Sequence, residues 1–136
     1  MSFELEEIKV AESKIQSGVD FPSYIQALIK LGVKKYDTFV RDQRTVYSGA
    51  GDFQIQSRSK YAKRRIANIS DKERFKHHLK SHQRGQIDYP TFCDRAAETG
   101  VEKWTVDTTR MTCTYYDKLN ATMLEEQIPT PKSPNN

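Results

Sequence analysis

The chain has 136 residues, a length that suits one domain with its own apolar core. Apolar residues make up 36% and charged residues 29%, a composition that favours a folded domain with a charged surface over a disordered chain. No apolar stretch approaches the length of a membrane span and the acidic start is unlike a signal peptide, so we expect a cytoplasmic protein that does not enter a membrane.

Two helices and two strands are predicted in the first half of the chain. The first helix carries an apolar stripe at Leu5, Ile8, Ala11 and Ile15. The second begins after Asp20, whose carboxylate suits an N-cap, and ends at Gly32, which suits a left-handed stop. Residues 33–40 and 45–48 have the β-branched and aromatic character of strands, and part of 53–69 is expected to add another.

The second half of the chain follows the same order. Ser70 and Glu73 form a capping box ahead of a helix, and a further helix runs from Asp88 to Gly100. Strands are predicted over 101–108 and 111–117, with a closing strand over 123–128 after a turn at 119–121. Residues 129–136 are polar and rich in proline, so we expect a disordered tail.

An internal repeat relates the two halves at an offset of 68 residues. The identical pairs are Asp20/Asp88, Pro22/Pro90, Gly32/Gly100, Val33/Val101, Lys35/Lys103 and Tyr47/Tyr115. The repeat predicts an α+β fold built by tandem duplication of an ααββ unit, with halves at about 1–56 and 70–128 of a single domain over 1–128. We expect the helices to pack on one face of an antiparallel sheet.

Aromatic residues mark the expected inner face of that sheet. If each hairpin keeps a constant register, Tyr36 lies opposite Tyr47 and Trp104 lies opposite Tyr115. The alternate positions carry charge, for example Lys35 and Asp37 and their counterparts in the second half. We therefore expect the four rings to pack in the core, the alternative being an exposed platform that stacks bases or sugars.

The second half resembles a known family through a series of short motifs. They are Asp88-Tyr89-Pro90-Thr91-Phe92-Cys93, Gly100-Val101, Trp104, Met111-Thr112-Cys113, Tyr115-Tyr116-Asp117 and Ile128-Pro129. This series resembles the YbcV-like family of uncharacterised bacterial and prophage proteins, often labelled putative phage envelope protein. The resemblance implies a related fold and a connection with phage, and it implies no assigned activity.

Individual reactive side chains give no clear catalytic site. Cys93 falls on an apolar helix face and Cys113 across from Val106, positions typical of buried thiols. His78 and His82 are one helical turn apart, but no third ligand is visible, so we expect no metal. Asp107 and Asp117 align with Phe39 and Gly49 in the first half of the chain, so the fold common to both halves does not require an aspartate there. They are site candidates for that reason only.

Cations are concentrated between Ser57 and Arg84, where Asp71 and Glu73 are the only acids. One interpretation is a phosphate-backbone contact surface for nucleic acid, in which Arg58, Lys60, Lys63, Arg64 and Arg65 take part. The other, which we favour, is a solvated face balanced by Glu4, Glu6, Glu7 and Glu12 of the first helix.

No phosphate loop, nucleophile elbow, zinc motif or catalytic pair of carboxylates is recognisable. The sequence therefore favours a non-catalytic binding or interaction module of unknown function, with a protein partner or a second copy as alternatives and no cofactor. Nucleic-acid binding and an enzyme of unidentified chemistry stay open. The candidate binding residues are Arg58, Lys60, Lys63, Arg64, Arg65, Tyr36, Tyr47, Trp104, Asp107, Cys113, Tyr115 and Asp117.

Overall fold

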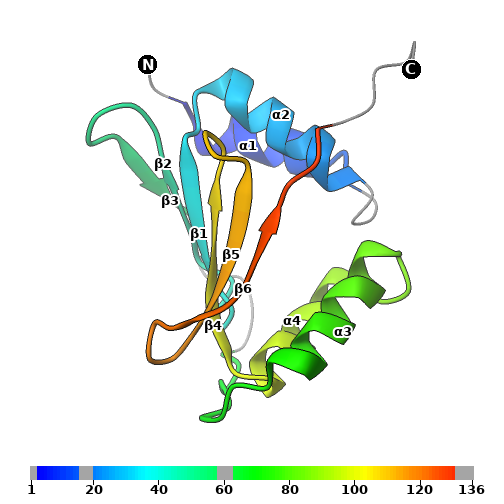
Figure 1. Ribbon diagram of the computed structural model, residues 1–136. Coiled ribbons are helices and arrows are strands. Elements are labelled where there is room, and N and C mark those ends of the chain that lie inside the picture. The colour runs from blue at the N-terminus through cyan, green and yellow to red at the C-terminus, as the bar shows by residue number, and fades with distance from the viewer. Residues whose placement is uncertain (1–2, 16–19, 58–62, 131–136) are drawn as a thin grey trace.

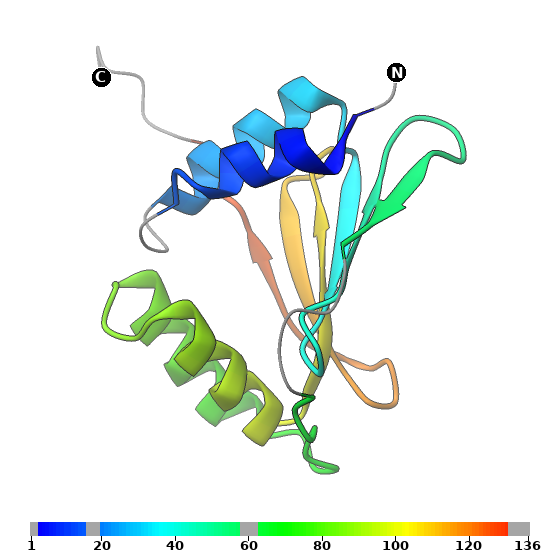
Figure 2. The ribbon, with the colours of Figure 1, turned by 180° about the vertical axis from the view of Figure 1, so that it is seen from behind.

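The computed structural model describes residues 3–15, 20–57 and 63–130. Those residues form four helices and six strands, a mixed α+β fold (Figures 1 and 2). The helices are α1 (Leu5–Glu12), α2 (Phe21–Leu31), α3 (Lys72–Gln83) and α4 (Tyr89–Glu98). The strands are β1 (Lys35–Phe39), β2 (Thr45–Ser48), β3 (Gln54–Gln56), β4 (Val101–Asp107), β5 (Thr112–Asp117) and β6 (Thr122–Gln127).

Local sequence signals set most of the helix ends. Gly32 follows α2 at φ 98° and Gly100 follows α4 at φ 93°, the left-handed backbone that glycine adopts without a Cβ clash. The Asp88 carboxylate accepts the Thr91 N–H at 2.9 Å, which satisfies a free donor at the start of α4.

Two expected caps differ in the structure. Asp20 precedes α2 without a side-chain cap hydrogen bond to its first turn. The cap of α3 is Asp71, which accepts the Arg74 N–H at 3.1 Å, so the capping box expected from Ser70 is wrong. Ser70 lies one residue before the cap and packs beside Gly100, so closely that a Cβ on Gly100 would lie 2.9 Å from the Ser70 Cα.

The six strands form one antiparallel sheet in the order β3-β2-β1-β4-β5-β6. The closing strands expected in each half are present as β3 and β6, each at an edge of the sheet. Residues 131–136, most of the expected tail, lie outside the described residues. No described helix is both long and apolar enough to cross a membrane.

The register puts the aromatic residues on one face, as predicted. Tyr36 pairs with Tyr47 and Trp104 with Tyr115, and all four side chains are buried. Three helices contribute rings to this face, with centroid distances of 6.5 Å for Tyr24–Tyr36, 5.8 Å for Phe92–Trp104 and 4.8 Å for Phe75–Tyr115. The aromatic face is therefore the inner face of the sheet, and core packing accounts for the rings.

Candidate functional site

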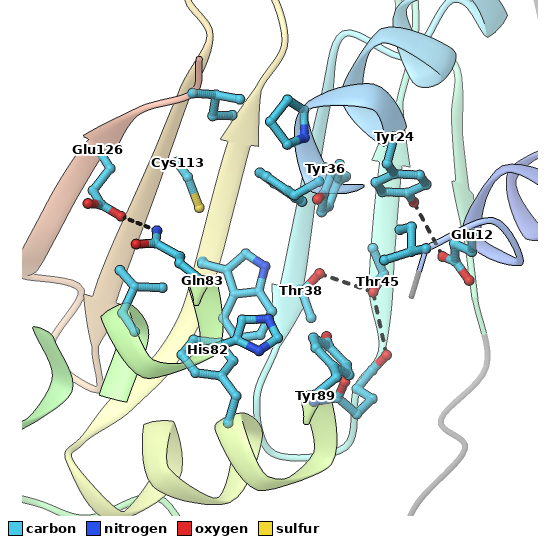
Figure 3. A pocket seen from close by; sticks show the side chains of 18 of the residues that line it. Glu12, Tyr24, Tyr36, Thr38, Thr45, His82, Gln83, Tyr89, Cys113 and Glu126 are labelled. Carbon is cyan, nitrogen blue, oxygen red and sulfur yellow. Dashed lines mark hydrogen bonds between the residues drawn. The ribbon is translucent and has the colours of Figure 1, made fainter. Parts of the chain in front are cut away.

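A cleft of about 990 Å³ opens above the aromatic face (Figure 3). All four helices, strands β1, β2, β4, β5 and β6, and the segment that follows β6 contribute residues to its lining. Its size lies at the upper end of the range of small-molecule sites. The cleft is larger than the second depression described below, and we treat it as the candidate site.

Five sequence-predicted residues meet at the floor of this cleft. They are Tyr36, Tyr47, Trp104, Cys113 and Tyr115. The ring centroids are 5.5 Å apart in the Tyr36–Tyr47 pair and 5.9 Å apart in the Trp104–Tyr115 pair. The floor therefore carries two aromatic pairs, which suit the apolar or planar part of a ligand.

A hydroxyl pair lies on the same floor. Thr38 and Thr45 face each other across β1 and β2, with their Oγ1 atoms 3.2 Å apart. Both side chains are buried, and both line the cleft. Sequence analysis missed them because threonine is common in strands, although their positions in the register would have placed them on the inner face.

The wall formed by α1 and α2 carries an ordered carboxylate. Glu12 Oε1 accepts the hydroxyl of Tyr47 at 3.0 Å and that of Tyr24 at 3.3 Å. Burial raises the pKa of both tyrosines well above their usual value, so their hydroxyls stay protonated and donate. This arrangement fixes Glu12 at the cleft, where it offers an acceptor to a ligand.

The wall formed by α3 and α4 is neutral at its centre. The His82 ring stacks on Phe92, with centroids 4.6 Å apart and planes 12° apart, and its Nδ1 lies 3.4 Å from the Ile87 carbonyl oxygen. Burial lowers the pKa of His82, so the ring is uncharged at pH 7. Beside it, Gln83 Nε2 donates to Glu126 Oε1 at 2.9 Å (Figure 3).

The rim of the cleft includes an accessible ring. Tyr89, at the start of α4, is 42% exposed and contacts Trp104 edge to face at a centroid distance of 6.3 Å. Neither Tyr89 nor Tyr24 was among the candidate site residues predicted from the sequence. Gln83, Glu126 and Glu12 carry no sequence signal that joins them to the cleft.

Both thiols are buried and neutral. Cys93 accepts a hydrogen bond from Gln43 Nε2 at 3.2 Å, and burial raises its pKa to about 11. Burial raises the pKa of Cys113, on the cleft floor, to about 12. Thiols with such pKa values are overwhelmingly protonated at pH 7 and are poor nucleophiles. Their place in the core agrees with the sequence interpretation.

Asp107 and Asp117 hold turns at opposite ends of β5. Asp107 Oδ1 accepts the N–H groups of Thr109 and Arg110, each at 2.9 Å. Asp117 Oδ1 accepts those of Leu119 at 2.9 Å and Ala121 at 3.0 Å. Neither lines the cleft, so the structure gives both a local role in a turn.

The basic candidates lie in a different place from the aromatic ones. Arg58 and Lys60 fall outside the described residues. Lys63, Arg64 and Arg65 precede α3 and line a second depression, of about 580 Å³. Its other lining residues are Arg41, Ile66, Glu102 and Lys118.

Within the described part of the chain, no ion pair joins the basic run to the acids of α1. The ion pairs seen there are Lys9–Glu6, Arg64–Asp94 and Arg95–Glu98. The described residues also contain no group of three or more His, Cys, Asp or Glu side chains that could hold a metal ion.

Fold and site together define an α+β protein with a central antiparallel sheet and an aromatic cleft on its inner face. A family model described as "Protein of unknown function (DUF1398)" matches residues 9–127, and the chain belongs to this family. No curated protein matches the chain.

Proposed function

We propose that this protein is a non-catalytic binding module whose cleft takes a small ligand with a planar or apolar body. The observation that carries the proposal is the cleft itself, about 990 Å³ above a floor of buried aromatic rings. Ligand sites in proteins combine mainly apolar and aromatic walls with a few placed polar groups. Glu12, His82 and the Thr38–Thr45 pair supply such groups here.

Binding is a better account of the cleft than catalysis because the thiol in its described lining is protonated and its carboxylates act as hydrogen-bond acceptors, a role that Glu12 can also play toward a ligand. Cys113 is protonated, Glu12 accepts two tyrosine hydroxyls, and Gln83 donates to Glu126. A screen of hydrolase, transferase and redox substrates should find no turnover that depends on Asp107, Cys113 or Asp117. Turnover abolished by substitution of one of them would refute the proposal.

The neutral planar dye Nile red is a direct probe of the cleft, because Trp104 is the single tryptophan and lies on its floor. Bound dye should fluoresce and quench Trp104 by energy transfer. Tyr89→Ala removes a half-exposed ring from the rim, so it should weaken dye binding on the order of fivefold, as expected for the loss of one aromatic contact.

Leu119→Ala is the matched control, because Leu119 is 89% exposed in the β5–β6 turn and does not line the cleft. It removes exposed apolar surface and should leave dye affinity unchanged. Equal loss of affinity in both variants, or dye binding without quenching of Trp104, would place the dye elsewhere and contradict the proposal.

We further propose that the fold arose by tandem duplication, with both helix pairs on one sheet face of a single domain. The supporting observation is the central strand pair, in which Asp37 lies opposite Thr105, its own counterpart at an offset of 68 residues. The sheet order is also symmetric about this pair. We also propose that the protein is YbcV-like and connected with prophages. The support for this is the series of motifs between Asp88 and Pro129.

A further inference from the structure

The β1–β2 turn, the β5–β6 turn and the segment before α3 lie at the end of the sheet away from α1 and α2 (Figures 1 and 2). Residues from all three line a depression there. It has a volume of about 580 Å³. Five cations line it, and Glu102 is the only acid in the lining: the cations are Arg41, Lys63, Arg64, Arg65 and Lys118. We call this set the basic depression.

One backbone and one side-chain hydrogen bond link the three separate segments that carry these cations. The Arg64 N–H donates to the Arg41 carbonyl at 2.6 Å, which joins the segment before α3 to the β1–β2 turn. Lys118 Nζ donates to Asn68 Oδ1 at 2.8 Å, which joins the β5–β6 turn to the same segment. Ile66, between them, is buried in the core. The depression is therefore part of the fold and not a chance gathering of surface chains.

Most of its charge is uncompensated within the described residues. Arg64 pairs with Asp94 at 2.8 Å, yet its Nη1 is buried without a hydrogen-bond partner. Arg41, Lys63 and Arg65 are exposed and form none of the ion pairs seen in the described part of the chain. Cations held together repel one another, and a bound anion relieves that repulsion.

We propose that the basic depression binds the phosphate groups of a ligand. The depression is open and wide enough for more than one phosphate, and both arginine and lysine recognise phosphate oxygens. The site differs from the contiguous basic run between Ser57 and Arg84. It recruits Arg41 and Lys118 from outside that run, and it leaves out the α3 cations Lys76 and Lys80.

Two matched double variants separate the depression from the run. Arg41→Gln with Lys118→Gln removes two cations of the depression that lie outside the run. Lys76→Gln with Lys80→Gln removes two exposed cations of the run that lie outside the depression. Both pairs change the net charge equally, and far-UV circular dichroism and thermal unfolding will check that each variant keeps the fold.

Two probes are used. Calorimetry measures the binding of sodium tripolyphosphate, and fluorescence anisotropy at several salt concentrations measures the binding of a fluorescein-labelled single-stranded dT 12-mer. The depression variant should bind tripolyphosphate on the order of fivefold more weakly, and the run variant should bind like wild type. If the phosphates come from nucleic acid, the oligonucleotide should bind too, and the depression variant should lower its log-log salt slope by about 1.4.

Binding of tripolyphosphate alone would support the site and identify free phosphate compounds as its ligands. Loss of affinity in the run variant that equals or exceeds the loss in the depression variant would overturn the proposal in favour of a diffuse basic face. Failure of both probes to bind at 25 mM salt would also overturn it. A third double variant, Lys63→Gln with Arg65→Gln, removes two cations from the segment before α3 that also lines the depression. It should repeat the result of the depression variant.

Discussion

Burial keeps the cysteine, tyrosine and histidine side chains that line the cleft neutral at pH 7. Cys113 and Tyr115 on the floor both have a raised pKa, because the apolar surroundings disfavour their ionised forms. His82 shifts in the opposite direction for the same reason, because its charged form is the protonated one. The cleft wall therefore carries a neutral imidazole at pH 7, and acid should charge it.

The pH dependence of stability should report this histidine. The folded-state pKa of His82 is lowered chiefly by burial, against smaller opposing effects of the Ile87 carbonyl and Asp88, so the unfolded state binds the proton more readily. Its contribution to stability is present above the unfolded pKa of about 6.5 and is lost as pH falls below it. Tm should therefore drop between pH 7.5 and 5.5, and less so in His82→Gln.

His77→Gln supplies the matched control, since His77 is exposed on the same helix. Its Tm should depend on pH as in wild type. Thermal unfolding of the three proteins at closely spaced pH values measures the effect. Identical pH dependence in wild type and His82→Gln would mean that solvent reaches the His82 ring. It would contradict the lowered pKa that burial gives this side chain.

At the scale of elements, Gly32 follows α2 and Gly100 follows α4 in different surroundings. Both have positive φ, so both positions disfavour a side chain. A Cβ at Gly32 would approach only Phe3 Cδ2, at 4.0 Å. A Cβ at Gly100 would lie 2.7 Å from the Ile69 carbonyl oxygen, because the segment before α3 crosses the α4–β4 junction there.

Alanine at the two positions should therefore have unequal costs. Gly32→Ala should lower the free energy of unfolding by about 1 kcal/mol, the usual cost of left-handed backbone for a non-glycine residue. Gly100→Ala should lower it by about 3 kcal/mol or more, because it adds a clash with backbone atoms that cannot move aside.

Urea unfolding followed by far-UV circular dichroism will measure both values, each variant serving as the control for the other. Equal losses would show that the segment before α3 can shift away from Gly100. That outcome would also weaken the case for a rigid basic depression, since the same segment lines it.

For the whole molecule, the β1–β4 pair is the joint between the halves. Asp37 and Thr105 lie opposite each other there, and the Thr105 hydroxyl donates to the Asp37 carboxylate. Tyr36 pairs with Val106 and Thr38 with Trp104 on the inner face. The relation between the halves, and the cleft that both supply with residues, therefore depends on this single register.

A designed disulfide will test the register. Asp37→Cys with Thr105→Cys places thiols at directly opposed positions, where a disulfide can close without backbone movement. Oxidation should raise the free energy of unfolding by about 4 kcal/mol relative to the reduced form, because the bond closes a long loop. Cys93 and Cys113 are buried and should not interfere.

Asp37→Cys with Lys103→Cys is the control, because Lys103 lies opposite Phe39 and thus two residues out of register. That pair should stay reduced under the same mild oxidation. Efficient bonding in the control, or none in the test pair, would contradict the central register and with it the proposed duplication.

The sequence by itself determined the features that depend on near neighbours along the chain. Periodic apolar residues and Gly32 and Gly100 place the helices and their ends, and constant register in each hairpin places Tyr36 opposite Tyr47 and Trp104 opposite Tyr115. Alternation of charged and aromatic residues along the strands was enough to choose the inner face. Only short-range geometry enters these predictions, so no knowledge of the packing was needed.

The tertiary structure alone decided which of these elements meet. Glu12 reaches Tyr47 across 35 residues and Gln43 reaches Cys93 across 50, so the cleft walls combine segments that no periodicity connects. The basic depression likewise joins the β1–β2 and β5–β6 turns to the segment before α3. Such long-range contacts depend on how the helices and turns pack against the sheet, and local sequence signals carry no information about that packing.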